Sequence, residues 1–218
     1  MRFLLNPANY DLADPTSIPN LLIQHLNIVS VSMLIALIIA LPLGWLVTRY
    51  PRLYLPVITV AGLLYTIPGL ALLALLVPLT GLNKSTIIIP LVLYAQLVLV
   101  RNTAAAINGI DPLLLEMGRA MGMDRWQMLR RVTAPLALPL IVAGIRVATV
   151  TTIGIASLAS LVGAGGLGDL IFSSIQNANY DEVLGGGLVI AAVAVTFDFL
   201  LLGIQTLLDR GRSAAATA

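Results

Sequence analysis

Cysteine is absent from the sequence, and histidine occurs once, at position 25. Without cysteine the chain can form no disulfide bond, bind no metal through thiolates and carry no cysteine nucleophile. A single histidine also gives little support to a metal site or to a catalytic triad. The composition therefore predicts no metal site and no bound cofactor.

Charged residues are also scarce. Asp, Glu, Lys and Arg make up 10% of the 218 residues, whereas soluble domains carry about 25%. So few charges cannot cover the surface of a globular domain. Instead, 59% of the residues are hydrophobic, and several apolar runs reach the ~18–20 residues that cross a bilayer. These runs do not alternate polar with apolar residues, so they predict an all-α polytopic membrane protein and not a β-barrel.

Five membrane spans are expected, within one transmembrane domain that covers residues 1–218. They lie at about residues 21–47, 53–79, 85–107, 136–162 and 185–208. Most of these runs are longer than the ~20 residues that a bilayer requires, so we expect tilted or kinked helices.

The positive charges indicate how this bundle is oriented. Five spans put the two termini on opposite sides of the membrane. If the C-terminus is cytoplasmic, nine arginines lie in cytoplasmic segments and only Arg2 and Lys84 lie outside. The nine are Arg49, Arg52, Arg101, Arg119, Arg125, Arg130, Arg131, Arg210 and Arg212. The positive-inside rule therefore predicts an extracytoplasmic N-terminus and a cytoplasmic C-terminus.

Helix-breaking residues occur inside the first three spans, at Pro42, Gly44, Pro68, Gly69 and Pro90. Such breaks are tolerated where neighbouring helices or water satisfy the freed backbone groups, and in transporters they often mark the substrate path. In the stretch TIPG, residues 66–69, we therefore expect Thr66, Pro68 and Gly69, with the preceding Tyr65, to line or gate a path. Simple bending is the alternative, since both residue types are common in membrane helices.

One segment between the third and fourth spans, at about residues 109–135, gathers much of the charge. An Asp-Pro dipeptide at residues 111–112 is a typical helix start, and Gly122 suits the left-handed turn after a helix. Asp124, with Gln127 three residues on, predicts a capping box for a second helix that Pro135 closes. We expect two short helices joined by a glycine elbow. They form either an ordinary surface loop or an amphipathic element that lies on the membrane or enters a groove on a partner.

The sequence GAGGLG at residues 163–168 fits a dinucleotide-binding pattern. That pattern binds dinucleotides only between a strand and a helix. Here it follows a membrane span, so we expect a flexible turn at the outer face. The sequence contains no Gly-Lys-Ser/Thr phosphate loop, which predicts that the chain itself does not bind ATP.

Among the polar residues of the expected spans, His25, Arg146 and Asp198 need a partner or an interface. His25 is expected at the outer interface, beside Gln24 and Asn27. Arg146, within the fourth span, is expected to extend its side chain toward the cytoplasmic end. Asp198 lies near the middle of the fifth span and needs a donor or water. Because intramembrane charges usually face the bundle interior, Asp198 belongs either to a structural polar contact or to a translocation path.

The charged segment resembles the coupling-loop signature of bacterial ABC importer permeases. That signature is Glu-Ala-Ala, three residues, Gly, nine residues, and then Ile-x-Leu-Pro. Glu116 and Gly122 match it, Met117 and Gly118 replace the two alanines, and residues 132–135 (Val, Thr, Ala, Pro) occupy the last four positions. Over about residues 60–208 the chain resembles the osmoprotectant branch of these permeases. The matching strings are YTIPGLALLALL (65–76), RNTAAAINGIDP (101–112), MGMDRWQMLRRV (121–132) and LVGAGGLGDLIF (161–172).

This resemblance implies the permease subunit, itself not an enzyme, of an ATP-driven importer of glycine betaine, choline or carnitine in the bacterial inner membrane. It implies cytoplasmic ATPase subunits, a second permease subunit, identical or different, and an extracytoplasmic substrate-binding protein, with no nucleic acid involved. It also places the GAGGLG turn beside the translocation path, so its four glycines, Gly163, Gly165, Gly166 and Gly168, are candidate gate or turn residues. The residues expected to contact the ATPase are Leu115, Glu116, Met117, Gly118, Arg119, Ala120, Met121, Gly122 and Arg125.

Alternative functions stay open at this point. Sister permeases for methionine and other small solutes share this architecture. A secondary transporter would often show inverted repeats, and a membrane enzyme would need clustered polar groups at membrane depth; the sequence displays neither. The few aromatic rings at membrane depth, Tyr65, Tyr94, Phe197 and Phe199, come from different helices. We therefore expect the permease to offer only a weak passage site for the solute.

Overall fold

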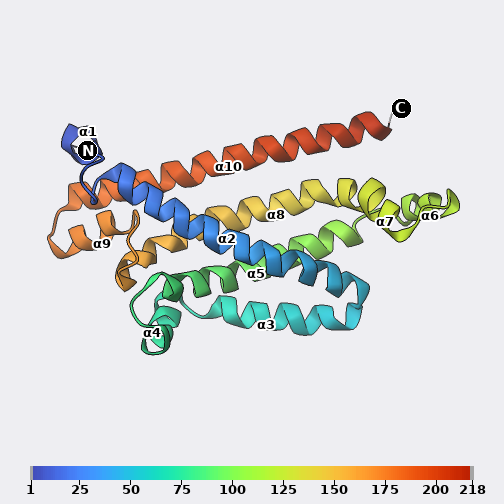
Figure 1. Ribbon diagram of the computed structural model, residues 1–218, viewed down its shortest axis with the longest axis horizontal. Helices are drawn as coiled ribbons and strands as arrows, with labels where there is room; N and C mark the ends of the chain where they lie inside the picture. Colours follow the sequence, from blue (N-terminus) through green and yellow to red (C-terminus); the bar gives the residue numbers. More distant parts are fainter. Residues whose placement is uncertain (1, 217–218) are drawn as a thin grey trace.

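A computed structural model describes the backbone of residues 2–216 and the side chains of residues 3–209. The described chain is helical and contains no strand (Figure 1). Its elements are α1 (Arg2–Leu5), η1 (Pro7–Tyr10), α2 (Ile18–Arg49), η2 (Pro51–Leu53), α3 (Tyr54–Thr66), α4 (Gly69–Thr80), α5 (Lys84–Asn108), α6 (Pro112–Ala120), α7 (Arg125–Met128), the π turn η3 (Leu129–Thr133), α8 (Ala134–Ile155), η4 (Ala156–Val162), α9 (Asp169–Gln176) and α10 (Tyr180–Ala216).

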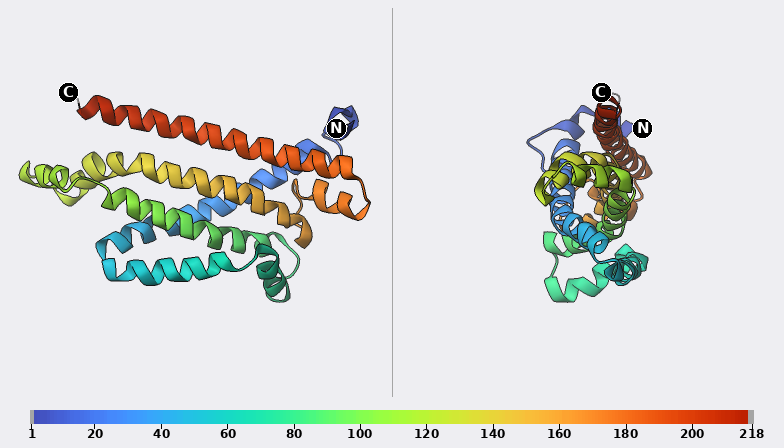
Figure 2. Two further views of the ribbon diagram at one scale, coloured as in Figure 1. Left: turned by 180° about the vertical axis from the view of Figure 1, so that it is seen from behind. Right: turned by 90° about the vertical axis from the view of Figure 1, so that its right-hand side faces the viewer.

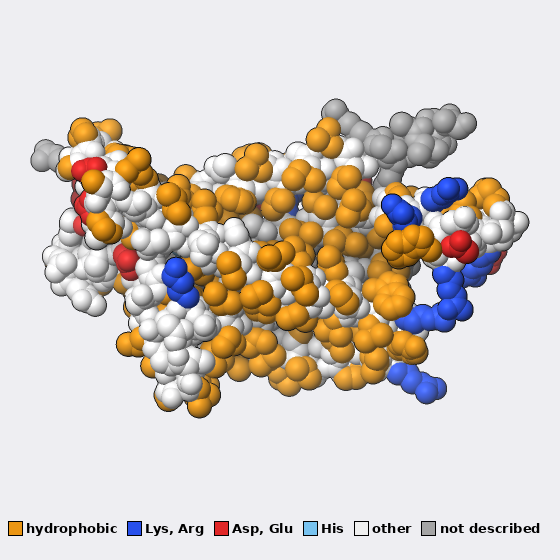
Figure 3. All heavy atoms as spheres, viewed as in Figure 1, with side chains coloured by type: hydrophobic (Ala, Val, Ile, Leu, Met, Phe, Trp, Pro, Cys, Tyr) orange, Lys and Arg blue, Asp and Glu red, His pale blue; other side chains and the backbone are white. Residues whose placement is uncertain are grey.

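The long helices run side by side along the long axis of the molecule (Figures 1 and 2). Helix α5 is central and packs against α2, α3 and α8, while α10 packs along α8 and α9. One end of the bundle, the N-terminal end, holds α1, α4 and α9. The opposite end holds α6 and α7, and most of the Lys and Arg side chains visible in Figure 3 gather there, so we call it the arginine-rich end.

Four helical segments are long and apolar enough to cross a membrane: Ile18–Arg49, Lys84–Asn108, Arg125–Val162 and Tyr180–Asp209. The expected second span, at residues 53–79, is not one continuous helix. It divides into α3 and α4, which meet at 92°. The 13 residues of α3 extend about 20 Å, and α4 turns aside at the N-terminal end. The chain therefore crosses the membrane four times by length alone, and five times if α3 and α4 count as one broken span.

The break between α3 and α4 lies at the predicted TIPG stretch. Ile67 is extended, with φ −68° and ψ 124°, because the ring of a following proline disfavours the helical conformation. The other expected interruptions do not break their helices: Pro42 lies inside an unbroken α2 and Pro90 inside an unbroken α5. Proline alone therefore does not determine where these spans end.

Small residues bring the three central helices close together. A Cβ atom on Gly44 of α2 would lie 2.6 Å from Thr103 Cβ of α5, and one on Gly144 of α8 would lie 2.5 Å from Asn102 Cβ. Such close backbone approach is how membrane helices gain packing contacts without a hydrophobic driving force. The core that results includes the buried residues Ile28, Ala36, Ala40, Ile87, Leu91, Leu99, Val100 and Ala148.

We predict that Gly44→Ala destabilises the fold, because its new methyl group must displace Thr103. Overpacking of this kind costs about 1–3 kcal/mol of unfolding free energy. The matched control is Gly62→Ala in α3, where an added Cβ meets no atom within 4 Å, and where removing a helical glycine is neutral or stabilises by about 0.5–1 kcal/mol. Thermal unfolding of the two variants in detergent measures both effects, and equal shifts would contradict the packing account.

Candidate functional site

The loop at the arginine-rich end begins with the predicted helix start. The Asp111 side chain accepts a hydrogen bond from the Leu113 N–H at 2.9 Å, and Pro112 is the first residue of α6. The second helix carries the predicted capping box: Asp124 Oδ1 accepts from the Gln127 N–H at 2.8 Å, and Gln127 Oε1 accepts from the Asp124 N–H at 3.1 Å. The first short helix and the caps of both helices are confirmed.

Gly122 forms the elbow between the two helices. Its φ is +73°, in the left-handed region, which glycine adopts at no steric cost and other residues rarely do. A Cβ on this residue would meet no atom within 4 Å. Backbone conformation, and not crowding, is therefore what requires glycine here.

Pro135 does not close the second helix, so that prediction is wrong. Helix α7 continues through the π turn η3 into α8, and the helical segment runs without a break from Arg125 to Val162, 38 residues. Proline lacks an N–H and its ring collides with the carbonyl four residues earlier in a regular α-helix. The wider π turn relieves that conflict: the Ala134 N–H bonds to the Leu129 carbonyl five residues back.

The nine residues expected to contact an ATPase all lie on α6, the elbow or the start of α7. Leu115 is half-buried and Gly118 is buried. Gly118 packs against Met128, since a Cβ on Gly118 would lie 2.6 Å from Met128 Cε. The remaining seven are exposed: Glu116, Met117, Arg119, Ala120, Met121, Gly122 and Arg125. Leu113 and Leu114 are exposed beside them. The loop thus presents an apolar surface with charged residues around it.

The break at Ile67 is held by a tyrosine from another helix. The Tyr94 hydroxyl of α5 donates a hydrogen bond to the Ile67 carbonyl at 2.8 Å, and its ring packs edge-to-face on Tyr65, with ring centroids 5.9 Å apart. A Cβ on Gly69 would lie 3.0 Å from Leu158 Cδ1 of η4. The freed backbone group therefore has a partner within the protein, as backbone inside a bilayer requires. The sequence did not reveal this role of Tyr94, because its partner is 27 residues away.

The GAGGLG turn at residues 163–168, called the glycine turn below, is packed against neighbouring elements. Gly163, Gly165 and Gly166 have φ values of +68°, +76° and +96°. The Gly166 N–H donates to Gln24 Oε1 of α2 at 3.1 Å, and a Cβ on Gly168 would lie 1.8 Å from the Ser157 carbonyl oxygen of η4. Leu167 within the turn is fully buried. The expected turn exists, but neighbouring helices hold it closely.

His25 is buried inside the bundle, which the sequence did not indicate. Its exposed fraction is 0%, and its Nε2 lies 3.0 Å from the carbonyl oxygen of Ile153. Ile153 belongs to the last turn of α8, where carbonyls lose their helical partners. His25 therefore lies at hydrogen-bonding distance from a backbone carbonyl at the end of a neighbouring helix, next to the glycine turn.

The short 3-10 segment η4 lies between two of the predicted functional regions. Its Leu158 faces Gly69 beside the helix break, and its Ser157 faces Gly168 in the turn. The structure thus brings the candidate path residues 65–69 and the candidate gate glycines to the same end of the bundle through one intervening element. Asp198 is not part of this group.

Asp198 of α10 forms an ion pair with Arg146 of α8. Arg146 Nε lies 2.5 Å from Asp198 Oδ1, and Nη2 lies 2.9 Å from Oδ2, so the pair is bidentate. The side chains are 28% and 32% exposed. Arg146 does not extend toward the helix end as expected. The donor that Asp198 needs is Arg146, which favours a structural contact, and a path role for Asp198 stays a prediction.

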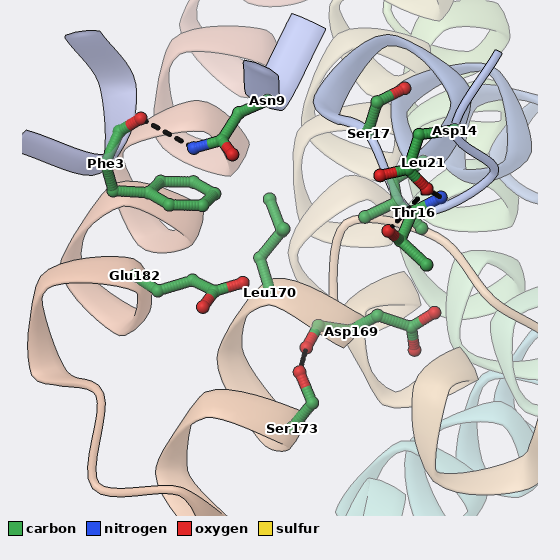
Figure 4. Close-up of a pocket in the computed structure, with 10 residues that line it drawn as sticks. All are labelled: Phe3, Asn9, Asp14, Thr16, Ser17, Leu21, Asp169, Leu170, Ser173 and Glu182. Carbon is green, nitrogen blue, oxygen red and sulfur yellow. Dashed lines mark hydrogen bonds between the residues drawn. The ribbon is translucent and has the colours of Figure 1, made fainter. Parts of the chain in front are cut away.

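A cavity of about 310 Å³ opens at the N-terminal end (Figure 4). Asp14, Asp169 and Glu182 line it with Phe3 and Asn9. Hydrogen bonds from the Thr16 hydroxyl and N–H lower the pKa of Asp14, so this carboxylate stays ionised. Among the described residues no three Asp, Glu or His side chains are placed to hold a metal. The cavity therefore gives this end an acidic surface.

The chain belongs to the family of binding-protein-dependent transport system inner membrane components, whose model matches residues 16–214. It is a multi-pass inner-membrane protein and a transport permease subunit.

Three named relatives match most of the chain. The osmoprotectant import permease protein OsmW of Salmonella typhimurium is 40% identical over 209 residues, which cover 94% of this chain and 97% of that protein. The carnitine transport permease protein OpuCD of Listeria monocytogenes is 41% identical and covers 85% of this chain and 84% of its own. The glycine betaine/carnitine/choline transport system permease protein OpuCB of Bacillus subtilis is 39% identical and covers 82% of both.

The fold is similar to that of a solved transporter. A chain of the MetNI methionine ABC transporter, in an inward-facing crystal structure, matches with a TM-score of 0.75 and 26% sequence identity. The match covers 85% of this chain and 93% of that chain. The all-α permease fold is therefore confirmed.

We predict that Asp198→Asn lowers the unfolding temperature, because Arg146 then loses its ionised partner within the membrane. The double variant Arg146→Met/Asp198→Leu removes both charges and is expected to restore stability and uptake together. Thermal unfolding and solute uptake are measured on the same preparations. A double variant as unstable as Asp198→Asn contradicts the pairing account. A stable double variant without uptake would instead assign Asp198 to the path.

Proposed function

We propose that this chain is the membrane subunit of an ATP-driven importer for osmoprotectants such as glycine betaine, choline or carnitine. The observation that carries the proposal is the projecting loop of α6 and α7, whose exposed apolar and charged surface suits insertion into a partner. The substrate class rests on the names of relatives at about 40% identity. The arginine-rich end is proposed to be cytoplasmic, by the positive-inside rule.

In this proposal the loop docks in a cleft of the ATPase subunit. Glu116, Met117, Arg119, Met121 and Arg125 supply exposed contacts, while Gly118 and Gly122 fix the angle between the two helices. A second permease subunit, identical or different, completes the path. The extracytoplasmic binding protein delivers the solute to the N-terminal end.

The path is proposed to pass the break between α3 and α4. Tyr65 is 42% exposed there, and the glycine turn packs nearby through η4. Two rings, Tyr65 and Tyr94, meet at this point, whereas quaternary ammonium groups are usually held in cages of several aromatic rings. The permease therefore offers a weak passage site, and selectivity resides in the binding protein.

Methionine import is a second candidate, because the fold resembles that of the MetNI methionine transporter. Reconstitution of the chain with its ATPase and binding protein in vesicles tests both. We expect ATP-dependent accumulation of radiolabelled betaine, choline or carnitine, and none of methionine. Accumulation without the ATPase subunit would contradict the proposal, and accumulation of methionine alone would replace the substrate class.

Gly122→Pro should disrupt the coupling between the permease and its ATPase, because proline fixes φ near −65° whereas this position requires +73°. Gly122→Asn is the matched control, since asparagine tolerates the left-handed region and a Cβ meets no atom here. We expect Gly122→Pro to insert normally and to lose most binding-protein-stimulated ATPase activity, while Gly122→Asn retains it. Wild-type stimulation in Gly122→Pro would show that the elbow is not needed for coupling.

Cysteine scanning tests the path, since the natural chain contains no cysteine. If residues 64–70 line a water-filled path, single cysteines at positions 65, 66 and 69 react with a water-soluble thiol reagent in at least one nucleotide state. A cysteine at the buried position 61 is the control that should not react. If none of these cysteines reacts in any nucleotide state, the residues pack against protein and do not line a water-filled path.

A further inference from the structure

An apolar groove of about 540 Å³ lies at the arginine-rich end. Its walls are Leu41 and Trp45 of α2, Ile107 of α5, Leu129 of the π turn, and Ala134 and Leu138 of α8, with two threonines as its only polar residues. Neither the coupling contacts nor the candidate path uses this groove. It lies where the coupling loop joins the fourth span.

The chemistry of the groove excludes most ligands. Its lining offers almost no hydrogen-bonding surface and no charge, so it does not suit a polar solute, a nucleotide or a hydrophilic partner. It does suit a hydrocarbon chain. Trp45 is 51% exposed and lies one helical turn before Arg49, the last residue of α2, as aromatic residues do at the boundary between hydrocarbon and headgroups.

Two arginines flank the groove. Arg49 follows Trp45 by four residues, so it lies on the face of α2 that carries this lining residue. Arg130 belongs to the π turn, directly after the lining residue Leu129. Arg130 is exposed and stands over the Trp126 ring at 5.7 Å. Neither guanidinium pairs with a carboxylate among the described side chains. Each is free to bind an external anion.

We propose that this groove binds an anionic phospholipid, with an acyl chain against Trp45, Ala134 and Leu138 and the phosphate between Arg49 and Arg130. Basic pockets between transmembrane helices are known to hold anionic headgroups. An occupied groove fills the space beside Leu129 and Ala134, so the lipid supports the π turn through which α7 continues into α8. This site goes beyond the proposed import function, and its direct test needs no transport.

Trp45 reports on the groove itself. The chain has two tryptophans, Trp45 and Trp126, so Trp126→Phe leaves Trp45 alone while keeping a ring beneath Arg130. This full-length variant is reconstituted in phosphatidylcholine vesicles that contain a small, fixed fraction of lipid with brominated acyl chains, which quench tryptophan on contact. The brominated lipid is either phosphatidylglycerol or phosphatidylcholine.

We expect stronger quenching by brominated phosphatidylglycerol than by brominated phosphatidylcholine at the same fraction. Replacing both arginines with glutamine should remove this preference, at about five-fold in relative affinity for each arginine. Arg101→Gln is the control, because Arg101 lies two residues from the lining Thr103 and so on the opposite face of α5. Ala134→Phe, which fills the groove, should weaken quenching by both lipids, whereas Ala105→Phe, exposed on that opposite face, should not.

Each result decides the proposal. Equal quenching by the two lipids would overturn it, because Trp45 would then report only ordinary contact with the bilayer. Absence of quenching by either lipid would also overturn it, and would mean that protein, such as the second permease subunit, covers the groove. The comparison between lipids uses the unfilled groove, so a failure of Ala134→Phe to fold does not affect it.

Discussion

One constraint governs the irregular backbone at the N-terminal end of the bundle: a peptide group that has no helical partner and is shielded from water must find a partner inside the protein. Three side chains meet that need at the N-terminal end. Tyr94 donates to the Ile67 carbonyl, His25 lies at hydrogen-bonding distance from the Ile153 carbonyl, and Gln24 accepts from the Gly166 N–H. Each comes from a different part of the chain than the group it serves. Polar residues that look isolated in apolar sequence are therefore what permits the break and the turn to exist there.

This dependence explains how far the sequence could predict the structure. The caps of α6 and α7 and the left-handed glycine at 122 were predicted correctly, because each depends on residues only a few positions away. The burial of His25 and the pairing of Arg146 with Asp198 were missed, because their partners are 128 and 52 residues distant. Proline was ambiguous for the same reason. Whether it breaks a helix depends on what its neighbours can supply, so Pro42 and Pro90 lie in continuous helices while Pro68 does not.

The continuity that follows from the π turn has a mechanical consequence. Because α7, η3, α8 and η4 form one 38-residue helical segment, this segment reaches roughly 57 Å, from the loop at the arginine-rich end to the elements around the candidate path. At its far end η4 touches Gly69 at the helix break and Gly168 in the turn. A displacement of the loop can therefore reach both regions as movement of one rod, without a separate chain of side-chain rearrangements. This rod departs from α-helical geometry at two places, the π turn and the 3-10 segment.

Arg146 lies within the middle of this rod, nine residues before its α-helical part ends at Ile155, a distance of about 14 Å. There it joins the rod to α10 through two parallel hydrogen bonds. Apolar contacts between two smooth helices allow several registers, whereas a bidentate guanidinium–carboxylate pair allows one. Even for a buried pair the contribution to stability is uncertain, and fixing register is the better-supported use. We infer that the pair fixes the register between α10 and α8. The last span then moves together with the rod instead of sliding along it.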